Sequence, residues 1–323
     1  MNTLYTDIAH SITTIDTGLI RPGFTASHLI VEKDEAAFVD VGPAVQCSTL
    51  LRTLEQKQIA PEQVRYIIVT HVHFDHAGSV GTLVKHFPDA QVVVHPKGAR
   101  HLINPEKLMA GAAAVYGEEK LLSIFGEMIA VPAEKVVQPE DNGILDLAGR
   151  RLLIRHTNGH ARHHLCVVDE RSQGIFTGDT FGLSYREFDT EQGYFIFPAT
   201  APVQFEPDAM RASLDLLLGY QPERLYLTHF GRVTDVAQLG ARLHRAIEQF
   251  VEFAQSVLTS GAERHQAIYN GIERLMLSEL AAHGCTLPPE KICALLRPDL
   301  ELDVMGLEVW LDRLRKRQKG HKA

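Results

Sequence analysis

The segment His71-Val72-His73-Phe74-Asp75-His76 carries the strongest structural signal in this sequence. It follows directly on residues 66–70, Tyr-Ile-Ile-Val-Thr, an apolar and β-branched run that is typical of a buried strand. Three imidazoles and a carboxylate in one tight turn would repel one another when protonated and would waste polar groups when buried. A bound metal ion offsets both costs, so the segment predicts a metal site at the end of a strand.

Three later polar residues stand in a similar place, each just past a run with strand character. They are His160 in Asn158-Gly159-His160, Asp179 in Gly178-Asp179 and His229 in Thr228-His229. Loops held at strand ends by a rigid sheet are the usual location of active-site residues. Each of the three alone is a common kind of loop residue, but their order after the first motif indicates one shared site.

The order of the motifs, HxHxDH, then GH, then GD, then a late histidine, resembles the metallo-β-lactamase fold superfamily of metallohydrolases. The resemblance covers roughly residues 8–235 and implies an α/β fold, a four-layer αββα sandwich with the metals at one edge of its two sheets. From about Val236 the pattern changes to long helical periodicity. We therefore expect a catalytic domain over residues 1–235 and an added helical C-terminal cap or dimerisation region over residues 236–323.

The resemblance implies a ligand set for two divalent metal ions. The first ion would be held by His71, His73 and His160. The second ion would be held by Asp75, His76 and His229, with Asp179 bridging the two ions. Asp40 matches a family position that supports the metal loop from behind the ligands, and His164 matches one that orients them.

The same residue types suit this assignment on chemical grounds. Imidazoles, alone or with a carboxylate, fit Zn²⁺ best here, with Fe²⁺ and Mn²⁺ as alternatives. A bridging carboxylate holds two such ions about 3.5 Å apart, and a water between them loses its proton near neutral pH. We expect this hydroxide to be the nucleophile and Asp75 to act catalytically by orienting it and taking its proton.

The segment after Asp179 offers a clue to the substrate. Residues 181–205 hold seven of the 23 aromatic side chains of the chain. One interpretation is an apolar wall beside the metals, with substrate contacts from Phe181, Tyr185, Tyr194 and Phe197 and a hydrogen bond from one of the tyrosines. The alternative is that the aromatic rings pack the C-terminal helices onto the sheet, since aromatic clusters dominate protein cores.

Composition excludes several other classes of protein. The chain has 323 residues and a formal net charge of −8, and this acidity argues against a broad nucleic-acid-binding surface. Its longest run without a charged residue, residues 192–205, is too short to span a bilayer, so no membrane partner is expected. The four cysteines form no CxxC pair and Met1 is followed by no signal-peptide pattern, so we expect a cytoplasmic protein.

Departures from the family pattern narrow the expected function. Secreted β-lactamases of the best-known zinc class use a cysteine where this chain has Asp179, and flavodiiron oxygen reductases have a glutamate in place of His73. What remains resembles glyoxalase II, lactonases and related thioesterases. We therefore expect a dinuclear hydrolase of a small-molecule carboxylic ester, lactone or thioester with an apolar acyl part.

Three alternatives stay open at this point. The same two metals could serve a phosphodiesterase, or a single iron could serve an oxidoreductase similar to the superfamily's persulfide dioxygenases. The chain could also be a non-enzymatic binding protein, although a complete ligand set favours catalysis. A homodimer formed through the C-terminal helices is a separate expectation.

Overall fold

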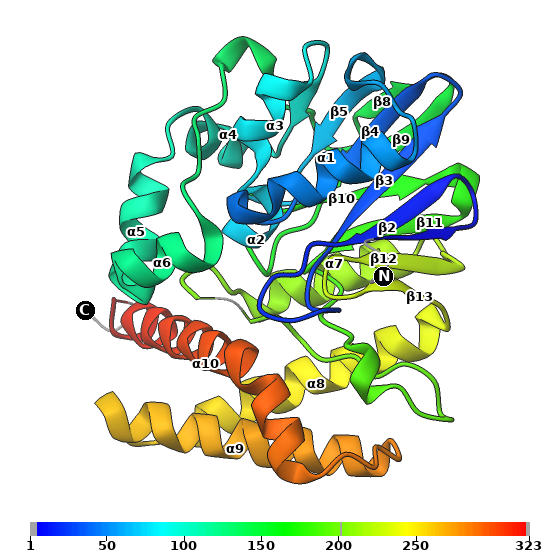
Figure 1. Ribbon diagram of the computed structural model, residues 1–323. Coiled ribbons are helices and arrows are strands. Elements are labelled where there is room, and N and C mark those ends of the chain that lie inside the picture. Colours follow the sequence, from blue (N-terminus) through cyan, green and yellow to red (C-terminus); the bar gives the residue numbers. More distant parts are fainter. Residues whose placement is uncertain (1–4, 201, 321–323) are drawn as a thin grey trace. The chain divides into compact units, whose positions relative to one another are not determined.

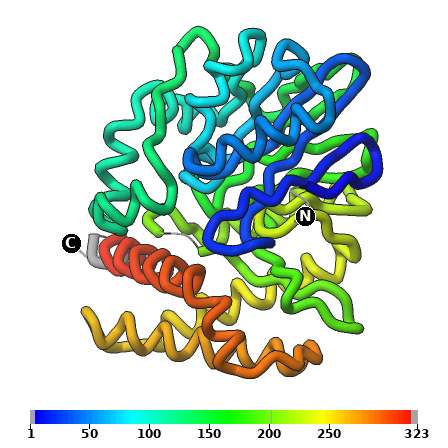
Figure 2. Tube along the Cα trace, in the orientation of Figure 1, coloured from blue at the N-terminus to red at the C-terminus, as the bar shows by residue number. Residues whose placement is uncertain are grey.

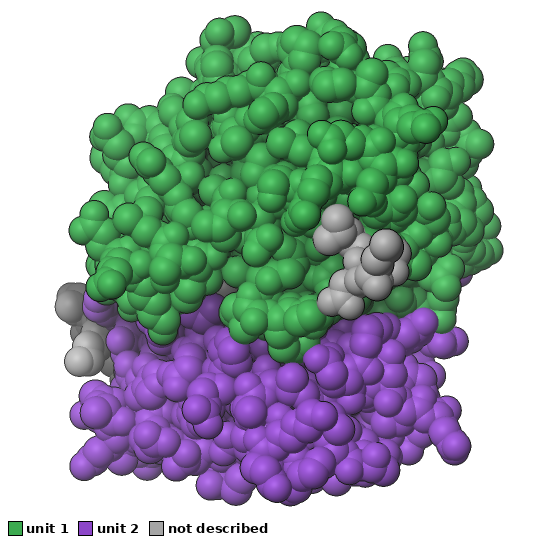
Figure 3. Space-filling model, in the orientation of Figure 1, with its two compact units in different colours: residues 1–157, 163–178, 222–234 green, residues 158–162, 179–221, 235–323 purple. Residues whose placement is uncertain are grey.

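The computed structural model describes residues 5–200 and 202–320, with side chains as far as residue 317. Its chain groups into two compact units, which Figure 3 colours separately. The first unit comprises residues 1–157, 163–178 and 222–234, and the second comprises residues 158–162, 179–221 and 235–323. The second unit combines the C-terminal residues from 235 onwards with two internal segments, and the expected division into a catalytic domain and a C-terminal region stays a prediction.

Both β-sheets belong to the first unit (Figure 1). The first sheet has seven strands in sequence order: β1 (Tyr5–Ile8), β2 (Ile12–Asp16), β3 (Ala26–Glu32), β4 (Glu35–Val39), β5 (Val64–Ile68), β6 (Gln91–Val93) and β7 (Val136–Val137). It is antiparallel from β1 to β4 and parallel from β4 to β7. A mixed sheet of this kind brings the C-terminal ends of β4 and β5 to the same edge.

The second sheet has six strands, also in sequence order: β8 (Ile144–Leu147), β9 (Arg150–His156), β10 (Leu165–Asp169), β11 (Gly174–Gly178), β12 (Arg224–Leu227) and β13 (Gly231–Val233). Only the pair β11 and β12 is parallel. The crossover between these two strands is the long segment that contains residues 181–205, so the ends of β11 and β12 also reach a common edge.

Alternating side chains of the two sheets form one apolar core. In β4, Ala37 and Val39 belong to this core together with Leu152 and Ile154 of β9. The intervening Phe38 has the opposite orientation and stacks on Phe87, just past helix α3 (Val80–His86), at 6.0 Å between ring centroids. This period of two is that of a strand covered on both faces, by the second sheet on one side and by a helix on the other.

The helices of the first unit are short: α1 (Cys47–Gln56), α2 (Phe74–Ala77), α3 (Val80–His86), α4 (Pro96–Ile103), α5 (Glu106–Tyr116) and α6 (Glu118–Phe125). One-turn 3₁₀ helices lie at Ala44–Gln46, Pro61–Gln63, Ala133–Lys135 and Glu170–Ser172 in this unit, and at Arg186–Phe188 in the second unit. Two residues, Gly78 and Ser79, separate α2 from α3.

The second unit holds the longer helices: α7 (Pro207–Leu218), α8 (Val236–Ser256), α9 (Gly261–Ala282) and α10 (Pro289–Gly320). Figure 2 traces α8 to α10 from yellow to red, and these three helices pack against one another. In α9 the buried residues Ile268, Ile272, Met276 and Leu280 recur every fourth position, which places them on one face. The helical periodicity expected over residues 236–323 is present across the described part of that range.

The expected fold class is confirmed: the molecule has two mixed sheets with flanking helices, the αββα arrangement, and an added helical C-terminal region. Within residues 5–200 and 202–320, no helix combines the length and the apolar character needed to cross a bilayer. The cytoplasmic location stays a prediction.

Candidate metal centre

Strand ends position the candidate ligands of the first unit. Two residues after β5, Thr70 leads into His71, and the extended backbone of His73 then turns into α2. This single helical turn carries Asp75 and His76. His229 comes two residues after the end of β12.

Asp75, His76 and His229 form a compact group within this unit. One ligand atom from each lies within 4.8 Å of the others, a spacing at which one metal ion can contact all three. The Asp75 Oδ2 atom lies 3.2 Å from His229 Nε2 and 3.7 Å from His76 Nε2. A carboxylate and two imidazoles are a donor set that zinc and borderline metals accept, so the group fits a divalent ion.

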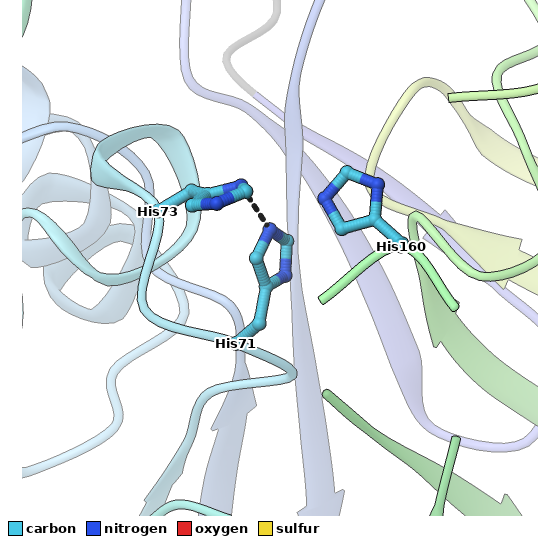
Figure 4. Close-up of side chains that lie close together, drawn as sticks. All are labelled: His71, His73 and His160. Carbon is cyan, nitrogen blue, oxygen red and sulfur yellow. Dashed lines mark hydrogen bonds between the residues drawn. The ribbon is translucent and has the colours of Figure 1, made fainter. Parts of the chain in front are cut away.

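His71 and His73 form a second group beside the first. Their Nε2 and Nδ1 atoms lie 2.8 Å apart, and Figure 4 marks this hydrogen bond. The ring of His71 also lies 4.0 Å from that of His76, measured between centroids. Such crowding of imidazoles is costly without a cation to share, because protonating more than one of them would place like charges in contact.

Asp40 holds these ligands from behind. Its buried carboxylate accepts hydrogen bonds from the amide and hydroxyl of Thr70, at 2.8 Å for the amide, and from the Thr228 hydroxyl at 2.6 Å. It also lies 2.7 Å from His76 Nδ1, which must donate because a carboxylate only accepts. Asp40 therefore fixes the tautomer of His76 that offers Nε2 to a metal.

The Thr70 hydroxyl orients His71 in a related way. Its proton goes to Asp40, at 2.9 Å from Oδ2, so its oxygen accepts from His71 Nδ1 at 3.1 Å. His71 is then left with Nε2 as its metal-binding atom. Gly178 leaves room for the Thr70 hydroxyl. Its φ is +47°, and a Cβ at this position would lie 2.5 Å from that hydroxyl oxygen.

The second unit places its own two candidate ligands together. His160 Nε2 lies 3.5 Å from Asp179 Oδ2, and both residues are buried. The Nδ1 atom of His160 donates to the Ala199 carbonyl at 2.9 Å, which again leaves Nε2 as the metal-binding atom. The loop depends on Gly159, because a Cβ there would lie 2.3 Å from the Cα of Met210 in α7.

His164 lies in the first unit behind His71. Their rings stack at 5.0 Å between centroids, and His164 Nδ1 lies 2.9 Å from the hydroxyl of Thr157. This placement suits the orienting role that the resemblance implied for His164. The neighbouring His163 lies farther away, with its ring centroid 6.3 Å from that of His71.

The aromatic segment after Asp179 differs from its expected substrate-binding role. Phe181, Tyr185 and Phe197 are all 0% exposed, so they cannot line an open wall. The Tyr185 hydroxyl donates to both carboxylate oxygens of Asp299 in α10, each at 3.0 Å, and is not offered to a substrate. The alternative interpretation, packing against the C-terminal helices, accounts for Tyr185 through its contact with Asp299.

Tyr194 is the member of this set that keeps some exposed surface. The guanidinium of Arg186 lies over its ring, 4.5 Å from the centroid, so this ring too has a partner within the second unit. No contact of Tyr194 with any of the candidate ligands is among those described for the chain, and its substrate role stays a prediction.

Sequence reasoning missed Thr70 and Thr228, which complete the support around Asp40. A signal for them exists, because both stand in a Thr-His dipeptide just past a strand, Thr70-His71 and Thr228-His229. Threonine is too common a strand residue for either one to stand out alone. Only the repetition of the dipeptide before two candidate ligands could have singled them out.

The sequence profile of the metallo-beta-lactamase superfamily matches residues 20–229, well over half of the chain. The chain belongs to the metallo-β-lactamase superfamily. Membership supports a metal-dependent hydrolase in general terms, and the clusters of histidine and aspartate described above supply suitable ligands for divalent ions.

Individual members of the superfamily are only distantly similar to this chain. The metallo-β-lactamase fold protein ST1585 of Sulfurisphaera tokodaii is 29% identical over 177 residues, which cover 54% of this chain and 63% of that protein. The human acyl-coenzyme A thioesterase MBLAC2 is 27% identical over 136 residues, covering 41% of this chain and 47% of MBLAC2. The chain therefore matches less than two thirds of the length of either relative.

Solved structures agree with the superfamily fold. The crystal structure of ST1585 superimposes with a TM-score of 0.64 at 22% identity, covering 93% of this chain and 99% of that one. The metallo-β-lactamase family protein TTHA1429 from Thermus thermophilus gives 0.67 at 19% identity, covering 96% and 94% of the two chains. At such identities the likeness shows the fold alone.

Proposed function

We propose that this superfamily member is a dinuclear metal-dependent hydrolase of carboxylic esters, lactones or thioesters with an apolar acyl part. The observation that carries the proposal is the set of oriented imidazoles. In His71, His76 and His160 the Nδ1 atom donates to an oxygen of the protein, so each ring presents Nε2. Three rings held in this one tautomer are hard to explain without a cation.

The proposed ligand assignment is the one that the family resemblance implies. His71 and His73, together with His160, would hold one ion, and the group formed by Asp75, His76 and His229 would hold the other. Asp179 would bridge the two. Zinc is the proposed metal because imidazole and carboxylate ligands suit it, while iron and manganese are accepted by the same donors.

Two bound ions would acidify a water and withdraw charge from the carbonyl that it attacks. The chain's own groups would supply the rest of the chemistry. Asp75, whose side chain is 22% exposed, can reach a substrate water and accept its proton at Oδ2. His229 Nε2 lies 3.2 Å from that carboxylate and helps to hold it in place. Asp40 and Thr70 keep the imidazoles oriented throughout, so no reorganisation is required during the reaction.

The choice of acyl substrates has indirect support. The relative MBLAC2 is named as an acyl-coenzyme A thioesterase, although the match covers 47% of its length. The best-known secreted β-lactamases are expected to have a cysteine at this position, whereas residue 179 of this chain is aspartate. Both points favour an acyl ester or thioester over a β-lactam as the substrate.

The test is an assay of the zinc-loaded protein on an aryl ester, an acyl lactone and an acyl thioester. We expect turnover of at least one of them, lost in the His71→Ala variant because one ion then lacks an essential imidazole. Rates no higher than those of His71→Ala on all three substrates would refute the proposal.

A further inference from the structure

Helix α10 places two carboxylates in the interior of the second unit. Asp299 and Asp303 stand one turn apart on the same face, and both are buried, at 7% and 2% exposure. Burial raises the pKa of Asp303 well above its usual range, and the neighbouring charge of Asp299 adds to this effect. A carboxylate in such a place costs stability, so its presence calls for a compensating role.

Asp303 is bonded to a single residue of the segment after β11. Its Oδ1 atom accepts from the backbone amide of Thr200 at 2.6 Å. The Thr200 hydroxyl in turn donates to the backbone carbonyl of Asp303 at 3.0 Å. These two hydrogen bonds fix both the position and the orientation of the peptide group that precedes Thr200.

That peptide group is also the one that holds His160. It consists of the Ala199 carbonyl and the Thr200 amide, and the Ala199 oxygen accepts from His160 Nδ1 at 2.9 Å. One continuous chain of hydrogen bonds therefore runs from the carboxylate through the peptide to the imidazole. Because hydrogen bonds in series polarise one another, the Asp303 carboxyl group strengthens the Ala199 carbonyl as an acceptor for His160.

We propose that Asp303 is a positioning residue for the metal ligand His160, acting through the peptide group between Ala199 and Thr200. The inference rests on the proposed function only in taking His160 as a ligand. It means that the C-terminal helices contribute to the metal centre, because α10 supplies the carboxyl group at the end of the hydrogen-bond chain that orients this imidazole. Loss of the link leaves the Ala199 carbonyl unsupported and the His160 ring less strictly held.

Asp299 provides a matched control on the same helix. It is also a buried carboxyl group, and it accepts from the Tyr185 hydroxyl, whereas Asp303 is hydrogen-bonded to the peptide group that holds His160. Asp303→Ala and Asp299→Ala therefore remove equivalent groups from equivalent surroundings. Asp303→Asn is the conservative variant, because its amide oxygen can still accept from the Thr200 amide.

The experiment has two readouts on the full-length protein. The first is zinc affinity, measured by competition with a chromophoric chelator. The second is the histidine ¹⁵N spectrum of the metal-free protein, which reports the fraction of His160 protonated at Nδ1. We expect Asp303→Ala to weaken binding of one zinc ion by about tenfold to a hundredfold and to lower that fraction. Asp299→Ala should change neither, and Asp303→Asn should fall between wild type and Asp303→Ala.

Two outcomes would overturn the inference. One is unchanged zinc affinity and tautomer in Asp303→Ala; the other is an equal loss in Asp299→Ala, which would mean that any buried carboxylate of α10 has the same effect. Should both alanine variants fail to fold, Asp303→Asn and Asp299→Asn decide in the same way. A wild-type protein that binds no zinc refutes the proposed function instead, while the spectrum of the metal-free protein still tests the link to His160.

Discussion

The Asp40 carboxylate holds more groups of the metal centre in place than any candidate ligand does. It accepts from the amide of Thr70, from two threonine hydroxyls and from His76 Nδ1. A buried acceptor of this kind has no water to replace it, so its removal strands four buried donors at once. The orientation of the ligands and the stability of the fold thus depend on the same side chain.

Replacement of Asp40 by alanine is expected to lower the free energy of unfolding by about 3 kcal/mol or more, because it leaves a set of buried donors without a charged acceptor. Thr228→Val removes only one of those hydrogen bonds and should cost about 1–2 kcal/mol. Urea unfolding of the two metal-free variants measures both values. Equal losses in the two variants would contradict the central place given to Asp40.

The candidate metal ligands could be predicted from the sequence, whereas the residues that orient them through hydrogen bonds could not. His71 stands in a motif whose composition is costly without a metal, and Asp179 belongs to the order of motifs that carries the family resemblance. Thr70 and Thr200 act through ordinary hydroxyl and amide groups, which no local pattern distinguishes from those of other threonines. Their importance comes from what lies opposite them in the fold, Asp40 and Asp303, which are distant in sequence.

At the level of elements, the segment between β11 and α7 shows where composition is ambiguous. An excess of aromatic residues is equally typical of an apolar binding wall and of a core. The structure favours the core, because Phe195 packs on His283 of the C-terminal region and Phe205 on Trp310 of α10. Sequence spacing cannot separate the two readings, since it does not say which helices will cover the segment.

Tyr185→Phe tests this correction. The hydroxyl serves Asp299 and no substrate, so KM and kcat for an ester or thioester should stay within about twofold of wild type. The free energy of unfolding should fall by about 1–2 kcal/mol, because the buried Asp299 loses a donor. Steady-state kinetics and urea unfolding give the two values. A large rise in KM without loss of stability would restore the substrate-binding role of Tyr185.

For the molecule as a whole, the helical C-terminus followed from periodicity and the αββα sandwich from the family resemblance, but the grouping of the chain into two units followed from neither. Residues 158–162 and 179–221 belong with the C-terminal helices although they lie inside the expected catalytic domain. Long-range packing decides this grouping, and periodicity reports only local structure. The homodimer expected through the same helices stays a prediction, which light scattering at high concentration can test.

Buried histidines outside the metal centre make the stability of the whole fold depend on pH. Burial lowers the pKa of His28 in β3 to about 4, and the ring donates to the Leu227 carbonyl at 3.1 Å. An unfolded chain takes up this proton below about pH 6.5, while the folded protein resists it down to about pH 4. The contribution of His28 is therefore complete above pH 6.5 and is lost as the pH falls towards 4.

We expect the free energy of unfolding of the metal-free protein to decline as the pH is lowered from 7.5 to 4.5, and to decline less steeply in His28→Gln. The comparison between the two proteins isolates His28, because all other histidines titrate in both. Urea unfolding at several pH values provides the slopes. Parallel slopes would show that His28 is not held neutral by the fold.

The most direct test of the central claim is a titration of metal-free protein with Zn²⁺ during hydrolysis of an acyl thioester or ester. If each of the two ligand groups holds one ion and both ions serve one reaction, the rate should rise until two equivalents of zinc per chain have been added and then stay constant. A plateau after one equivalent, or no hydrolysis at any zinc concentration, would contradict the dinuclear hydrolase proposed here.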